Sequence, residues 1–157
     1  MSIAYDRLGE TYLVSGRSAA AREAYENSLA IRQRLAEAEP ENAQAQRDLT
    51  IANEGLSEAL RQSGHLAAAL DAQRRSLAIR VRLAEADPQN ADAERDVTVA
   101  YRKLALLLEQ AGDAVAARDA AQKCLEIRLR QAEADPQNAR LQHDLHTVYD
   151  DLARLCL

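Results

Sequence analysis

The segment Leu83-Ala84-Glu85-Ala86-Asp87-Pro88-Gln89-Asn90-Ala91 occurs three times in this chain of 157 residues, each time with small changes. It also reads Leu-Ala-Glu-Ala-Glu-Pro-Glu-Asn-Ala at 35–43 and Gln-Ala-Glu-Ala-Asp-Pro-Gln-Asn-Ala at 131–139, so the step from copy to copy is 48 residues. About half of the positions in 35–82 are identical to the aligned positions in 83–130. The chain is therefore built from internal repeats, and we expect each copy to form the same structural unit.

Two residue types mark the ends of the elements in each copy. They are Gly16, Gly64 and Gly112, and Pro40, Pro88 and Pro136. Glycine tolerates the left-handed backbone that ends a helix. Proline suits the first helical turn, and we expect the acidic residue before it to be the N-cap. The apolar residues between these marks follow steps of three and four, which predicts one helix near 41–63 and a second near 66–86. Each copy is then an antiparallel helical hairpin.

Composition narrows the class of protein. The chain has no Trp or Phe, five Tyr and a net charge of −5, and Ala and Leu supply most of its apolar residues. Small residues suit close helix packing, and the acidic balance argues against nucleic acid or an anionic membrane as partner. No apolar run is long enough to span a membrane, and the N-terminus lacks the features of a signal peptide. We expect a cytoplasmic protein in which Cys124 and Cys156 are reduced thiols, with a disulfide as the lesser alternative.

The first copy carries a recognisable motif. It reads Tyr5-x-x-Leu8-Gly9-x-x-Tyr12, followed by Gly16 and Ala21-x-x-x-Tyr25. This resembles the signature W-x-x-L-G-x-x-Y…A-x-x-x-F of the tetratricopeptide (TPR) repeat family. The resemblance covers nearly the whole chain, although later copies depart from it, for example with Asn53 at the place of the first aromatic residue. The usual unit has 34 residues. We attribute the longer step of 48 residues to a lengthening of both helices by about two turns at the same end of the hairpin.

The resemblance implies an all-α fold, namely a right-handed superhelical solenoid of three antiparallel helical hairpins and a terminal helix. We treat 1–157 as a single domain with units at about 1–39, 40–87 and 88–135 and a terminal helix at 136–157. Stacked units of this kind bury apolar faces that no unit buries alone. The first helices of the hairpins would line the concave face, where ligands of the family usually lie.

Carrying the family's inner-face positions over to this chain predicts a binding groove for a protein or peptide. The predicted groove residues are Asp6, Glu10, Leu13, Ile51, Glu54, Glu58, Arg61, Val99, Arg102, Leu106, Glu109, Asp150 and Arg154, together with Ile3 and Thr147. The first two units supply carboxylates and the later ones supply arginines, to which the longer helices add Arg95 and Arg140. A bound segment would then need basic character at one end and acidic character at the other. The alternative is an ordinary solvated surface of mixed charge. Acidic residues at the places that hold C-terminal carboxylates in some relatives argue against that kind of clamp.

Other patterns have mainly structural interpretations. Asp48, Asp96 and Asp144 recur in every copy, and we interpret them as bonded to the arginine pairs 32/34, 80/82 and 128/130 rather than as a ladder for a ligand. His143-x-x-His146 lacks further metal ligands, so we expect no metal site and no cofactor. Cys124 replaces serines 28 and 76 as a small packing residue, and the five tyrosines are interpreted as core residues.

The sequence therefore predicts a protein–protein interaction scaffold and no enzyme, because no motif supplies a nucleophile with its base, an oxyanion site or a phosphate loop. Similar long-unit arrays look like the recognition parts of larger bacterial proteins, and this chain would be an excerpt of one. The alternative is a self-assembling structural module, a homo-oligomer that stacks head to tail through open repeat ends, with Leu152, Leu155, Cys156 and Leu157 as a sticky tail.

Overall fold

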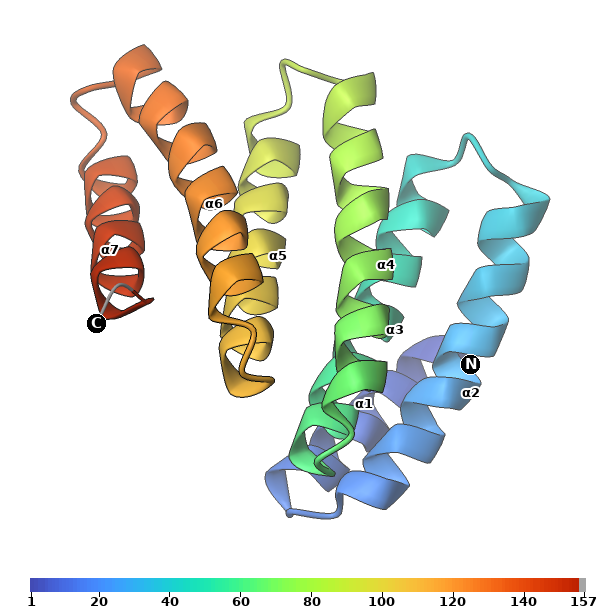
Figure 1. Cartoon of the computed structure of the whole chain (residues 1–157). Helices are drawn as coiled ribbons and strands as arrows, with labels where there is room; N and C mark the ends of the chain where they lie inside the picture. Colours follow the sequence, from blue (N-terminus) through green and yellow to red (C-terminus); the bar gives the residue numbers. More distant parts are fainter. Residues whose placement is uncertain (156–157) are drawn as a thin grey trace. The chain divides into compact units, whose positions relative to one another are not determined.

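The computed structural model describes residues 1–155, and those residues form helices and connecting turns without any strand. The helices are α1 (Ser2–Val14), α2 (Ser18–Ala38), α3 (Ala43–Gln62), α4 (Leu66–Ala86), α5 (Ala91–Gln110), α6 (Ala114–Ala134) and α7 (Ala139–Leu155). The all-α class and the tandem helical hairpins are confirmed, and α3 and α4 lie within two residues of their predicted bounds (Figure 1). None of the described helices has the combination of length and apolar content that crossing a bilayer requires.

The glycine turns form as predicted. Gly16, Gly64 and Gly112 have φ of +72°, +78° and +82°, and the described residues contain no other backbone with positive φ. At the first of these turns the N–H of Arg17 donates to the carbonyl of Tyr12 (2.8 Å), and the N–H of Gly16 donates to the carbonyl of Leu13 (3.1 Å). The same two bonds recur at the other glycines. This is the Schellman motif, in which a left-handed residue lets the chain satisfy the last carbonyls of the helix.

The proline segments differ from the prediction. Pro40 lies in a turn outside the helix, and α3 begins three residues later with Asn42 as its N-cap. The Asn42 side chain accepts from the N–H groups of Gln44 (3.0 Å) and Ala45 (3.1 Å), and Asn90 caps α5 by accepting from the N–H of Ala93 (3.1 Å). The acidic residue before the proline is not the cap. It is the first residue of a β-turn whose second residue is proline, where the fixed φ of proline fits. The asparagine at the end of this turn then caps the helix, because asparagine is as good a cap as aspartate.

The chain consists of two compact units, Met1–Leu83 and Ala84–Leu157, and the boundary falls in the last turn of α4. In the first unit α2 packs against both α1 and α3. Ser57 on α3 donates to the carbonyl of Ala69 on α4 (2.9 Å). Tyr25 of α2 forms the centre of this unit, where its ring lies against Gly9 of α1 and Gly55 of α3. The two glycines let the backbones of α1 and α3 approach this bulky ring of α2.

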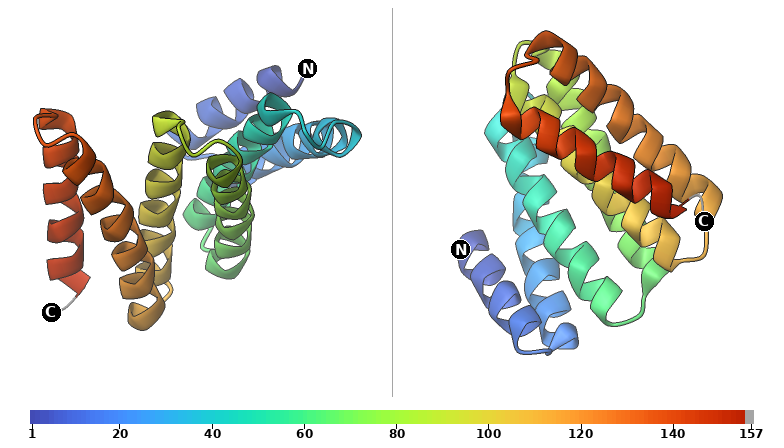
Figure 2. Two further views of the ribbon diagram at one scale, coloured as in Figure 1. Left: turned by 90° about the horizontal axis from the view of Figure 1, so that it is seen from above. Right: turned by 90° about the vertical axis from the view of Figure 1, so that its left-hand side faces the viewer.

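In the second unit α6 packs between α5 and α7 (Figure 2). Its core contains Cys124, Leu125 and Val148, with half-buried Tyr101 and Leu152 packed against them. Cys124 is 2% exposed, and its Sγ donates to the carbonyl of Thr98 (3.4 Å). Burial raises the pKa of this thiol to about 11, so it stays protonated and serves as a packing residue, as predicted. Cys156 lies outside the described residues.

Candidate functional site

Two of the predicted groove carboxylates, the buried Asp6 and the half-buried Glu54, bond the second helix of their own hairpin. Asp6 is 8% exposed and accepts a hydrogen bond from Ser28 (2.6 Å) and an ion pair from Arg32. Glu54 accepts from Ser76 (3.2 Å) and Arg80 (2.7 Å) in the same way. These acids join the two helices of the first and of the second hairpin. A sequence signal for the pairing exists, because the serine and the arginine follow the acid by 22 and 26 residues in both hairpins.

The other predicted groove residues of the first unit lie at its surface. Glu10 is exposed, Ile51 is 49% exposed, and Leu13 is half-buried. Glu58 and Arg61 are both half-buried and bond to each other along α3 (2.6 Å). This surface is therefore less acidic than the sequence indicates, because two of its carboxylates point into the protein and a third is paired.

The third hairpin breaks the charge pattern. The position of Asp6 and Glu54 is occupied by Arg102, while Arg128 still stands where Arg32 and Arg80 stand in the earlier copies. Two cations thus replace an ion pair. Arg128 bonds Asp144 (3.2 Å) of α7, and Arg102 bonds Asp151 (2.7 Å) of α7.

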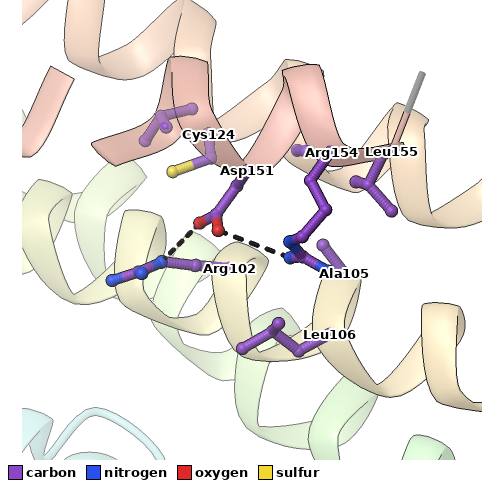
Figure 3. Close-up of a pocket in the computed structure, with 9 residues that line it drawn as sticks. Arg102, Ala105, Leu106, Cys124, Asp151, Arg154 and Leu155 are labelled. Atoms are coloured by element: carbon purple, nitrogen blue, oxygen red, sulfur yellow. Dashed lines mark hydrogen bonds and ion pairs between the residues drawn. The ribbon is translucent and has the colours of Figure 1, made fainter. Parts of the chain in front are cut away.

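Helix α7 supplies both compensating carboxylates, and Figure 3 shows one of them, Asp151. Asp151 lies between Arg102 and Arg154 and bonds both, and Arg154 also pairs with Glu109 of α5. Asp151 is not among the groove residues predicted from the sequence. The predicted residue is Asp150, whose exposed carboxylate lies 3.7 Å from His146. The two aspartates differ by one helical step, about 100° around the axis, which is within the error of carrying a register onto a lengthened helix.

The predicted links between the recurring aspartates and the arginines form in part. Arg128 and Asp144 make the expected ion pair. In the first hairpin the prediction is wrong about the atom, because Arg32 donates to the backbone carbonyl of Asp48, whose carboxylate accepts from Gln44 instead (2.8 Å). The Arg32 guanidinium already has the carboxylate of Asp6, so the Asp48 side chain is free to turn along its own helix.

The second unit contains a hollow of about 370 Å³ on the predicted inner face. Its walls come from α5, α6 and α7. The lining residues are Arg95, Thr98, Val99, Arg102, Lys103, Leu106, Cys124, Arg128, Arg140, Asp144, Thr147 and Val148. The structure therefore brings together the predicted residues Val99, Arg102, Leu106 and Thr147, and adds Arg95 and Arg140 to them. Glu109 and Arg154 pair nearby, while Asp150 is not among the lining residues.

The first unit has a hollow of about 740 Å³ that the sequence reasoning did not predict. It is lined by the second half of α2, the first half of α3 and the second half of α4, with Asn53 and Gln46 among its polar residues. Asn53 is two residues from the predicted groove residue Ile51, about 200° around α3. This hollow therefore opens on the side of α3 away from that residue.

The remaining sequence candidates are the histidine pair His143 and His146 and the tyrosines. Within residues 1–155, no three His, Cys, Asp or Glu side chains come together as metal ligands would. Thr147 bonds the carbonyl of His143, and the exposed His146 lies beside Asp150. Tyr149 is 47% exposed, so the expectation that every tyrosine is a core residue is wrong for this one.

Comparison with known proteins agrees with the helical repeat. The family model described as tetratricopeptide repeat matches residues 3–41 and 54–90. Among solved structures, one titled "Crystal structure of MamA protein" matches with 18% identity over 99% of this chain and 86% of that chain, at a TM-score of 0.36. No curated protein matches at a significant level. The family match supports a repeat family of the tetratricopeptide type for this chain.

Proposed function

We propose that this protein is an interaction scaffold that binds a segment of another protein on the face formed by the first helices of its hairpins. Tetratricopeptide-type repeats support a binding role in general. The observation that carries the choice of face is the hollow of about 370 Å³ between α5 and α7, because four residues predicted from the family's inner face line it together. Arg95 and Arg140 line the same hollow and add to the surface that a segment would contact.

The chemistry of the hollow fits a peptide better than a small molecule. Val99 and Leu106 offer apolar contact, and Leu106 is 38% exposed. Several cationic side chains line the hollow beside them, and Arg95, Lys103 and Arg140 are exposed to solvent. An open, mixed surface of this kind gains affinity from many modest contacts along a chain.

The test uses a displayed library of random linear 12-residue peptides selected on the full chain. Val99→Trp fills the hollow and is expected to weaken the selected peptides at least tenfold. Val115→Trp is the matched control, because Val115 is 71% exposed on α6 and does not line the hollow. Circular dichroism checks that both variants fold. Failure to select any peptide, or equal sensitivity to both substitutions, would show that this face does not bind a segment.

Self-assembly is the second reading of the sequence. Leu152 packs against the core of the second unit and Leu155 lines a small cavity there, so these residues have intramolecular partners. Leu157 lies outside the described residues. Light scattering over a wide concentration range tests the idea, and growth of mass that charges at positions 155 and 157 abolish would favour a homo-oligomer.

A further inference from the structure

The charge reversal in the third hairpin coincides with the inner-face hollow. In the first two hairpins an acid on the first helix neutralises the arginine of the second helix, through Asp6–Arg32 and Glu54–Arg80. In the third hairpin the acid is replaced by Arg102, so two cations of one hairpin meet at the wall of the hollow. The first two hairpins compensate their arginine internally, whereas the two arginines of the third hairpin depend on Asp144 and Asp151 of α7 for compensation.

The neighbouring residues increase this excess of positive charge. Five cationic side chains line the hollow, namely Arg95, Arg102, Lys103, Arg128 and Arg140, against the single carboxylate of Asp144. Asp144 is engaged by Arg128, and Arg102 is engaged by Asp151. Arg95 and Arg140 are exposed and form no ion pair within residues 1–155. The local charge is therefore opposite to the net charge of −5 of the whole chain.

We infer that the hollow between α5 and α7 binds an acidic protein segment, whose Asp or Glu carboxylates bond Arg95 and Arg140 and approach Arg102. This inference rests on the proposed function and specifies the chemistry of the partner. Arginine presents a planar fork of N–H donors that matches a carboxylate with two parallel hydrogen bonds. The apolar side chains of Val99 and Leu106 would contact aliphatic residues between the acids. Affinity that comes from exposed charges has to fall as salt is added.

Fluorescence anisotropy with three labelled 12-residue peptide pools tests the inference. One pool has Asp or Glu at half of its positions, the second has Asn or Gln there, and the third has Lys or Arg, with Ala, Leu and Ser elsewhere. The acidic pool is expected to bind at least tenfold more tightly than the other two, with an affinity that falls between 50 mM and 500 mM salt.

Two variants locate the effect. Arg102→Glu restores the carboxylate that the first two hairpins carry at this place, and the double variant Arg95→Glu/Arg140→Glu reverses the two unpaired cations. Each is expected to weaken the acidic pool at least tenfold. The matched control is Arg34→Glu/Arg74→Glu, which makes the same change of net charge as the double variant at exposed places in the first unit. The double variant keeps the test decisive if Arg102→Glu, which loses its bond to Asp151, does not fold.

The outcomes separate the two proposals. If the pools bind with equal affinity and Val99→Trp weakens all of them, the inner face binds a segment and the acidic specificity is wrong. If the control variant weakens the acidic pool as much as Arg95→Glu/Arg140→Glu does, the binding reflects general charge and the inference also fails. If no pool binds, the proposed function and the inference fail together.

Discussion

At the scale of single residues, the clearest constraint is the contact between Tyr25 and two glycines. A Cβ on Gly55 would lie 2.1 Å from Cε1 of the ring, and a Cβ on Gly9 would lie 2.7 Å from the other side. Both glycines are inside helices, where glycine is usually a disadvantage. Tyr25 is 4% exposed, so the ring has no free direction into which to move.

Gly55→Ala is therefore expected to destabilise the protein by about 1 to 3 kcal/mol, the usual cost of overpacking. At a helix position without this contact the same change stabilises by about 0.5 to 1 kcal/mol. Chemical denaturation measures the free energy of unfolding. Tyr25→Ala vacates the space, and in that background Gly55→Ala is expected to stabilise. A destabilisation that persists without the ring would contradict this packing.

The pKa of Tyr25 predicts a pH dependence. Burial, with the nearby charges of Glu10, Asp6 and Glu58, raises this pKa from 10.0 to about 12. Because the folded-state pKa is above the unfolded value, folding favours the neutral phenol. That stabilisation is complete below pH 10 and is lost as the pH rises from about 10 to about 12. The free energy of unfolding should fall less steeply in Tyr25→Phe over this range. Parallel curves for the two proteins would show that Tyr25 is not responsible.

At the scale of helices and hairpins, buried ion pairs join the first helix to the second. The side chains of Arg32 and Asp6 are 5% and 11% exposed, and Ser28 adds a hydrogen bond to the same carboxylate. Removing one partner of a buried pair leaves the other charge without compensation. The effect should differ in kind from the loss of an exposed pair on one helix.

Asp6→Asn is expected to cost about 3 to 5 kcal/mol of stability. The control is Glu26→Gln, which breaks the exposed pair with Arg22 (3.5 Å) and should cost about 0.5 kcal/mol or less. Thermal or chemical unfolding of both variants gives the comparison. Equal losses would mean that the Asp6 pair contributes no more than a surface contact.

The helices could be predicted from the sequence because glycine and the apolar period act locally. The N-cap residues could not be predicted in this way. Asp87 and Asn90 both have good capping side chains and are three residues apart, and the turn between them decides which one caps α5. The sequence did not show that two predicted groove acids would face arginines instead of solvent, and the reason lies in tertiary packing. Asp6 and Glu54 lie on the predicted helices, but their arginine partners are more than twenty residues away in sequence. Only tertiary packing decides whether such an acid faces solvent or an arginine.

At the scale of the whole molecule, features that recur in several copies of the repeat can be distinguished from features found in one copy. The glycine turns, the asparagine caps and the acid–arginine pairs serve the fold wherever they recur. The hollow of the second unit lies at a departure from the repeat, where Arg102 replaces an acid and α7 supplies Asp144 and Asp151. Whether the chain forms a right-handed superhelix, acts in the cytoplasm or belongs to a larger bacterial protein stays a prediction from the sequence.

The most direct test of the binding face is a titration of the ¹⁵N-labelled full chain with one selected peptide, followed by ¹H–¹⁵N correlation spectra. We predict that the shift changes concentrate on Val99, Arg102 and Leu106 of α5 and on Thr147 of α7. The amides around Leu29 and Ile79, which line the hollow of the first unit, should keep their positions. Changes confined to those residues, or no changes at saturating peptide, would contradict a scaffold that binds through the inner face of α5 and α7.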